Sequence, residues 1–79
     1  MKVPRKVHGR DFANHLIRRW DFHELRQTGS HIILRTEVPI GLTVSVPAHK
    51  PLRLGTFSGL LDTIAAHKNV SVESVLKRL

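Results

Sequence analysis

The sequence predicts a small α+β domain with the order helix, three antiparallel strands, helix, followed by a short helical extension. Three observations lead to this prediction. The chain has 79 residues, which suffices for a single domain spanning residues 1–79. Apolar residues recur at helical spacing in two segments, near residues 9–20 and 57–65. Between them lie three segments rich in β-branched and aliphatic residues. Both main helices are expected to cover one sheet face and leave the other open.

Residues 9–20 are predicted to form an amphipathic first helix. One side of it carries Phe12, Ala13, Leu16, Ile17 and Trp20. Asp11 suits the positively charged first turn. Trp20 and Phe22 then bring two aromatic side chains to the junction with the sheet, where both are expected in the core.

A β-hairpin is predicted next, with strands at residues 23–27 and 30–36. Thr28-Gly29 is expected to form its two-residue loop, since glycine is typical of such turns. With that loop, Arg26 lies opposite His31 and both share one sheet face.

In the same register the core receives Leu25, Ile32 and Leu34, while His31, Ile33 and Arg35 lie on the other face. Phe22 would then stand opposite Arg35. Since an aromatic core residue does not suit that place, we expect irregular pairing near the helix junction.

The third strand is predicted at residues 42–46, with inward Leu42, Val44 and Val46 and outward Thr43 and Ser45. Pro47 ends it, and residues 48–55 form a loop.

Thr56 is expected to cap the second helix, whose apolar stripe holds Phe57, Leu60, Leu61, Ile64 and Ala65. Residues 69–71 break that helix. Ser71 can cap a terminal helix with inward Val72, Val75, Leu76 and Leu79.

The chain is strongly basic: 13 Lys and Arg against 6 Asp and Glu give a formal net charge of +7. The electrostatic field of such a positively charged protein attracts polyanions, of which nucleic acid is the commonest. A soluble basic surface and a surface for an acidic protein are the alternatives.

There is no cysteine, which excludes disulfides, thiolate nucleophiles and cysteine-based zinc sites and fits a reducing cytoplasm. No apolar run is long enough for a membrane span or a signal core, so we expect neither membrane association nor export.

Four sequence blocks stand out along the chain. In chain order they are Lys2-Val3-Pro4-Arg5, Phe22 with Arg26-Gln27-Thr28-Gly29-Ser30-His31, Val46-Pro47-Ala48-His49, and Gly55-Thr56-Phe57. Together they resemble the HicA (YcfA-like) family of mRNA interferases. The block ending in Gly-Ser-His is the most specific, and the four together span nearly the whole chain. The sequence departs from the family at His8, Asp21 and Phe57, where Ser or Thr, Gly, and Leu are usual. The first two departures concern the start of the first helix and the turn into the first strand.

The resemblance implies a fold like the double-stranded-RNA-binding domain and ribosome-independent cleavage of mRNA by a toxin of a toxin-antitoxin system. It also implies that the histidine of Gly-Ser-His, here His31, is catalytic, and that a HicB-like antitoxin protein blocks the same surface.

RNA cleavage by acid–base chemistry requires proton transfer at two oxygens and a cation for the phosphate. Imidazole suits proton transfer because its ordinary pKa, about 6.5, lies near the working pH. We therefore expect His31 to act as base or acid, with no metal and no cofactor, while Arg26 neutralises the phosphate. The second proton-transfer group is left open among His49, His23 and solvent.

RNA contacts are expected from Arg26, Lys50, Arg5 and Lys6. The remaining histidines are expected on the surface: His8, His15, His23 and His67. The alternative function is a non-catalytic RNA- or DNA-binding module of the same fold, in which His31 and Arg26 only contact phosphates. An interaction protein that binds an acidic partner is a third possibility.

Overall fold

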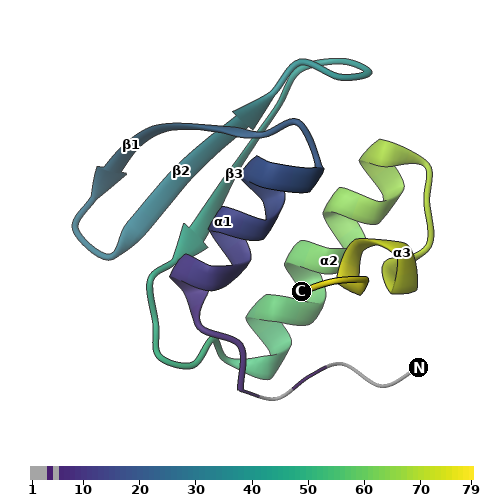
Figure 1. Ribbon diagram of the computed structural model, residues 1–79. Helices are drawn as coiled ribbons and strands as arrows, with labels where there is room; N and C mark the ends of the chain where they lie inside the picture. Colours follow the sequence, from purple (N-terminus) through teal and green to yellow (C-terminus); the bar gives the residue numbers. More distant parts are fainter. Residues whose placement is uncertain (1–3, 5) are drawn as a thin grey trace.

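A computed structural model describes residues 4 and 6–79 and confirms the α+β fold. The elements follow the predicted order: α1 (Gly9–Arg19), β1 (His23–Thr28), β2 (His31–Thr36), β3 (Leu42–Pro47), α2 (Leu54–Lys68) and α3 (Val72–Leu76). The strands form one antiparallel sheet in the order β1-β2-β3, and the helices pack on it (Figure 1).

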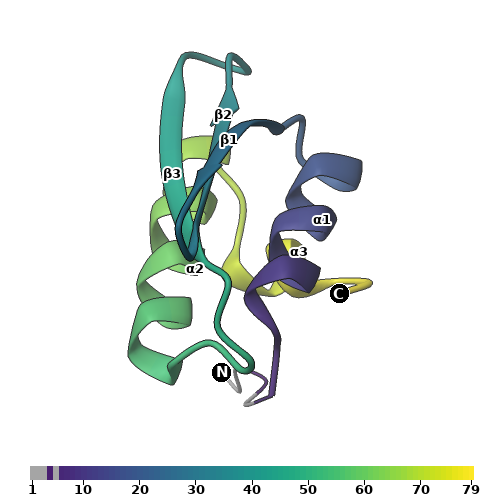
Figure 2. The same cartoon turned by 90° about the vertical axis from the view of Figure 1, so that its left-hand side faces the viewer.

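The core lies between the helices and one face of the sheet. The strands contribute to it Ile32, Leu34, Thr36, Val44 and Val46, and the two main helices contribute Phe12, Ala13, Leu16, Phe57, Leu61, Ile64 and Ala65. The rings of Phe12 and Phe57 meet edge to face, with 4.9 Å between their centroids, which joins α1 to α2. Figure 2 shows α1 displaced to one side of the strands. The opposite sheet face carries exposed and half-buried side chains.

The hairpin loop differs from the predicted one by a residue. Gly29-Ser30 forms the loop, and Thr28 pairs with His31. Gly29 has φ 59°, which suits the first central position of a tight hairpin turn. A Thr28-Gly29 loop would place Thr28 there, and a β-branched residue resists positive φ. Arg26 therefore lies opposite Ile33 instead of His31, but it keeps the face that His31 occupies.

A bulge in β1 overturns the prediction for Leu25. The pairing slips between Glu24, which lies opposite Leu34, and Arg26, so Leu25 is the extra residue and is 45% exposed. The irregularity expected near the helix junction is thereby confirmed. Phe22 lies before the strand and is buried, whereas Trp20, also expected in the core, is half-buried. Between the two, Asp21 adopts φ 62°.

The second helix begins earlier than predicted. Its N-cap residue is Arg53, without a side-chain hydrogen bond, so Thr56 lies within the helix and does not cap it. The helix ends where expected, at a left-handed Asn69. Ser71 caps α3 as predicted, since its Oγ accepts a hydrogen bond from the Ser74 N–H. With 15 residues, α2 is the longest helix, and no helix in the described part of the chain is long and apolar enough to cross a membrane.

Two of the histidines expected on the surface are packed instead. His15 is 2% exposed, and its Nε2–H donates to the buried Val75 carbonyl at 2.6 Å, which fastens α3 to α1. His67 is half-buried and donates from Nε2 to the Ile40 carbonyl at 2.8 Å. Leu79, expected inward, is 41% exposed.

Arg10 of α1 holds β1 by polar contacts. Its guanidinium donates to Glu24 at 2.8 Å and to Gln27 at 2.9 Å. The hydrogen bond from Arg10 is the main cause of a lowered pKa at the Glu24 carboxyl. Because the folded-state pKa is lowered, this bond stabilises the fold above the ordinary carboxyl pKa and loses that effect as pH falls through the lowered one.

We expect Arg10→Ala to raise the pKa of Glu24 toward its ordinary value, since the donor that favours the carboxylate is removed. A carbon-13 NMR titration of the Glu24 carboxyl measures this directly. Arg18→Ala is the matched control, because Arg18 is an exposed residue of the same helix and lies outside this contact. An unchanged titration in Arg10→Ala would contradict the assigned cause.

Candidate functional site

His31 stands on the open face of the sheet, at the end nearest the hairpin loop. It is the first residue of the central strand β2, and it lies between Thr28 of β1 and Pro47 of β3. The imidazole is exposed, as predicted. A side chain that starts a central strand is held by backbone pairing on both sides, so the ring has a fixed base and free access to solvent.

The ring of His31 contacts Ser45 of β3. Its Nδ1 lies 3.2 Å from the Ser45 Oγ, within hydrogen-bond distance. Ser45 pairs with Ile33 and is thus the diagonal neighbour of His31 on the same face. Because this contact uses Nδ1, the other ring nitrogen, Nε2, is available to a ligand.

Arg26 is the second diagonal neighbour of His31 on this face, since it lies opposite Ile33. Diagonal neighbours in a sheet lie about 7–8 Å apart, a distance that long side chains span. Arg26 is exposed and forms neither an ion pair nor a side-chain hydrogen bond among residues 4 and 6–79. Its guanidinium is therefore available to an anion beside His31.

Arg35, two residues beyond Ile33, is engaged within the protein. Its Nε pairs with Glu37 at 2.5 Å, and it also donates to the Thr43 hydroxyl at 2.8 Å. The hydrogen bond from Arg35 is the main cause of a lowered pKa at Glu37. Between Arg26 and Arg35, Arg26 is thus the arginine that is available to a phosphate.

The two candidate histidines lie at different ends of this face. His23 pairs with Arg35, four residues along β2 from His31, which corresponds to about 13 Å. His49 follows β3 at the His31 end. The N–H of Ala48 donates to the Ser30 carbonyl at 2.6 Å, and the His49 carbonyl accepts from the Gly9 N–H at 2.9 Å. The backbone thus brings His49, and not His23, to the end of the sheet where His31 lies.

Of the other basic residues predicted to contact RNA, the structure describes Lys50 and Lys6. Lys50 is exposed in the loop after β3, and Lys6 is exposed before α1. A hydrogen bond of 2.8 Å from the Leu52 N–H to the Val7 carbonyl joins these two segments. Both lysines therefore lie at the His49 end of the molecule, while Arg5 lies outside the described residues.

Ser45 is the residue that sequence reasoning overlooked. The alternation in residues 42–46 places it on the open face, but nothing in the pattern shows which neighbour its hydroxyl meets. That contact follows from the β2–β3 register, which the sequence leaves undetermined.

Within residues 4 and 6–79, no three His, Asp or Glu side chains gather closely enough to hold a metal ion. Comparison of the chain with protein-family models, with curated proteins and with solved structures finds no match.

Proposed function

We propose that this protein is an RNA-cleaving toxin of the HicA type, an endoribonuclease that acts on mRNA with His31 as its catalytic residue. The observation that carries the proposal is the exposed imidazole of His31 with Arg26 as its diagonal neighbour on the open sheet face, a guanidinium that forms no ion pair among residues 4 and 6–79. An open face suits a polymer substrate because a strand of RNA can lie across it without entering a cleft.

The proposed reaction is an internal transesterification. A base removes the proton of the 2′-hydroxyl, the 2′-oxygen attacks phosphorus, and the 5′-oxygen leaves with a proton from an acid. The products are a 2′,3′-cyclic phosphate and a 5′-hydroxyl. His31 takes one of the two proton-transfer roles through Nε2, and Arg26 neutralises charge on the phosphate.

His49 is the better placed of the two histidines for the other proton-transfer role. Its segment is bonded to Ser30, the residue before His31, whereas His23 lies four residues along the sheet. Lys50 follows His49 directly, and Lys6 lies on the neighbouring segment, so RNA that reaches His31 meets positive charge at this end.

A HicB-like antitoxin protein in the cytoplasm is the proposed inhibitor. Its acidic groups would pair with Arg26 and Lys50 and so cover His31. Inhibition of this kind needs no change in the fold of the toxin.

The test is an assay of the purified full chain with 5′-labelled single-stranded RNA, with and without EDTA. We expect fragments that end in 2′,3′-cyclic phosphate in both samples. Binding without fragments would contradict the enzyme and favour the non-catalytic nucleic-acid-binding module. Fragments only without EDTA would contradict the metal-independent chemistry.

We expect Ser45→Ala to slow cleavage about threefold to tenfold, the effect of losing one hydrogen bond that orients a side chain. It should also shift the pH–rate profile and the nitrogen-15 resonances of the His31 ring, because Nδ1 loses its partner. Thr43→Ala is the control, since Thr43 lies on the same strand and face but contacts Arg35. Equal slowing in both variants, with unchanged His31 resonances, would show that Ser45 has no positioning role.

A further inference from the structure

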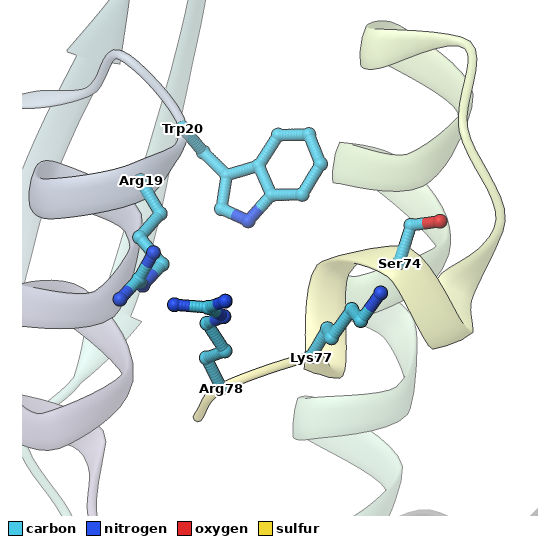
Figure 3. Close-up of a pocket in the computed structure, with 5 residues that line it drawn as sticks. All are labelled: Arg19, Trp20, Ser74, Lys77 and Arg78. Atoms are coloured by element: carbon cyan, nitrogen blue, oxygen red, sulfur yellow. The ribbon is translucent and has the colours of Figure 1, made fainter.

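Basic side chains also gather between α1 and α3, away from the His31 face. A hollow of about 220 Å³ is lined by Arg19, Trp20, Ser74, Lys77 and Arg78. We refer to it as the α1–α3 hollow (Figure 3). Two of its residues come from the end of α1 and three from α3 and the residues after it. None of them belongs to the His31 face.

The polar groups around the hollow are nearly all hydrogen-bond donors. Arg19, Lys77 and Arg78 supply cationic N–H groups, and indole nitrogen only donates. Figure 3 shows the indole nitrogen of Trp20 pointing toward the Arg78 guanidinium, with Arg19 approaching from α1. A ligand that satisfies this set must offer several acceptor oxygens and negative charge.

No carboxylate of residues 4 and 6–79 forms an ion pair with these three cations. The ion pairs in this part of the chain join Arg10 to Glu24 and Arg35 to Glu37. Arg19 by itself has a structural explanation, because a cation in the last turn offsets the negative end of a helix. The same explanation is weaker for Lys77 and Arg78, because α3 has only 5 residues and therefore a small dipole.

The walls of the hollow are held together from within the core. The buried His15 side chain of α1 donates to the Val75 carbonyl of α3 at 2.6 Å. Val75 is fully buried and lies one residue from Ser74 and two from Lys77. The spacing between the backbone segments that carry these cations is therefore set by the fold, which lowers the entropic cost of bringing the cations together around a ligand.

We propose that the α1–α3 hollow binds a phosphate group of a nucleotide. The phosphate oxygens accept from Arg19, Arg78 and Lys77 and from the indole N–H, and the attached base or sugar packs against the half-buried indole. A volume of about 220 Å³ is below that of most pockets that enclose a whole small molecule, so it suits the phosphate and leaves the base at the rim. The phosphate can belong to a free nucleotide or to a single strand.

The neighbouring aromatic ring favours a nucleotide over an acidic peptide. The carboxylates of an acidic peptide are bound by cations alone. A nucleotide carries an aromatic base beside its phosphate, and that base binds more tightly when an indole ring lies at the same site. The proposal does not depend on RNA cleavage, since the hollow shares no residue with the His31 face.

The single tryptophan of the chain makes the test direct, because its indole N–H gives one assignable NMR signal. The nitrogen-15-labelled full chain is titrated separately with inorganic phosphate, adenosine monophosphate, a short single-stranded RNA and a polyglutamate peptide. We expect a saturable shift of the Trp20 signal with the mononucleotide or with the RNA, and a weaker one with inorganic phosphate. Saturation by the mononucleotide identifies a free-nucleotide site, and saturation by RNA alone identifies a strand-binding site.

Arg19→Gln combined with Arg78→Gln should weaken this binding roughly tenfold or more, because two charge-assisted contacts are lost. Two separate single variants, Arg18→Gln and Arg53→Gln, are the controls, since both residues are exposed and lie outside the hollow. Preserved amide spectra establish that the variants fold. The proposal is overturned by equal weakening in a control, by no saturable Trp20 shift with any nucleotide, or by an equal response to polyglutamate.

Discussion

Replacement of His31 by alanine is expected to lower the rate of RNA cleavage by roughly 10²- to 10⁴-fold, the usual contribution of a positioned acid or base. His31→Gln should be equally inactive, because an amide forms hydrogen bonds but does not exchange protons near neutral pH. The measurement is the rate of appearance of labelled RNA fragments from equal amounts of purified protein. Growth arrest on expression should disappear in parallel.

The loss should leave the fold intact. His31 is exposed, and the hydrogen bond of its ring within residues 4 and 6–79 is the one to Ser45, so the free energy of unfolding should change by no more than about 0.5 kcal/mol. His23→Ala is the matched control: His23 is an exposed histidine of the same face, paired at the far end with Arg35. Full cleavage by His31→Ala, or an equal loss in His23→Ala, would contradict the assignment of His31.

The second large effect is expected at Gly9, where α1 begins against the backbone at the end of β3. A Cβ atom at Gly9 would lie 1.8 Å from the Pro47 carbonyl oxygen and 2.8 Å from the Pro47 carbonyl carbon. Both contacts are with backbone, so no side-chain rotation relieves them. Gly9→Ala must therefore move the start of α1 away from Pro47 and lengthen the 2.9 Å hydrogen bond to the His49 carbonyl.

We expect Gly9→Ala to destabilise the fold by about 1–3 kcal/mol, the range found for overpacked sites. Urea unfolding measures this, and the midpoint should fall without a change in slope. Gly59→Ala is the control: nothing lies within 4 Å of a Cβ there, and alanine in a helix interior should stabilise by about 0.5–1 kcal/mol. A Gly9→Ala protein as stable as the wild type would show that this contact yields easily.

Most of the fold could be predicted because local patterns and long-range packing agree. The alternation of Val44 and Val46 and the apolar stripe of α2 predict buried side chains that the structure places in the core, except that Leu60 of the stripe is half-buried. The sequence pattern predicts the hairpin loop one residue too early, at Thr28-Gly29. Only the geometry of the turn separates a loop of Thr28-Gly29 from one of Gly29-Ser30. The difference changes the residue opposite Arg26 from His31 to Ile33.

Features that depend on contacts between distant segments could not be predicted. Leu25 is apolar and is therefore expected in the core, but the β1 bulge leaves it exposed. His15 is polar and is therefore expected at the surface, yet it is buried, and its ring N–H donates a hydrogen bond to the Val75 carbonyl, 60 positions away. For the site, the exposure of His31 followed from strand alternation, whereas its contact with Ser45 required the register of β3 on β2.

The bulge at Leu25 also bears on how this chain behaves at high concentration. β1 is the outermost strand on its side of the sheet, so its outward backbone groups face solvent and offer a template for a foreign strand. An extra residue in its middle interrupts the regular spacing of those groups, and the charged Glu24 and Arg26 flank the interruption. Straightening the strand by deletion of Leu25 should therefore favour self-assembly into aggregates.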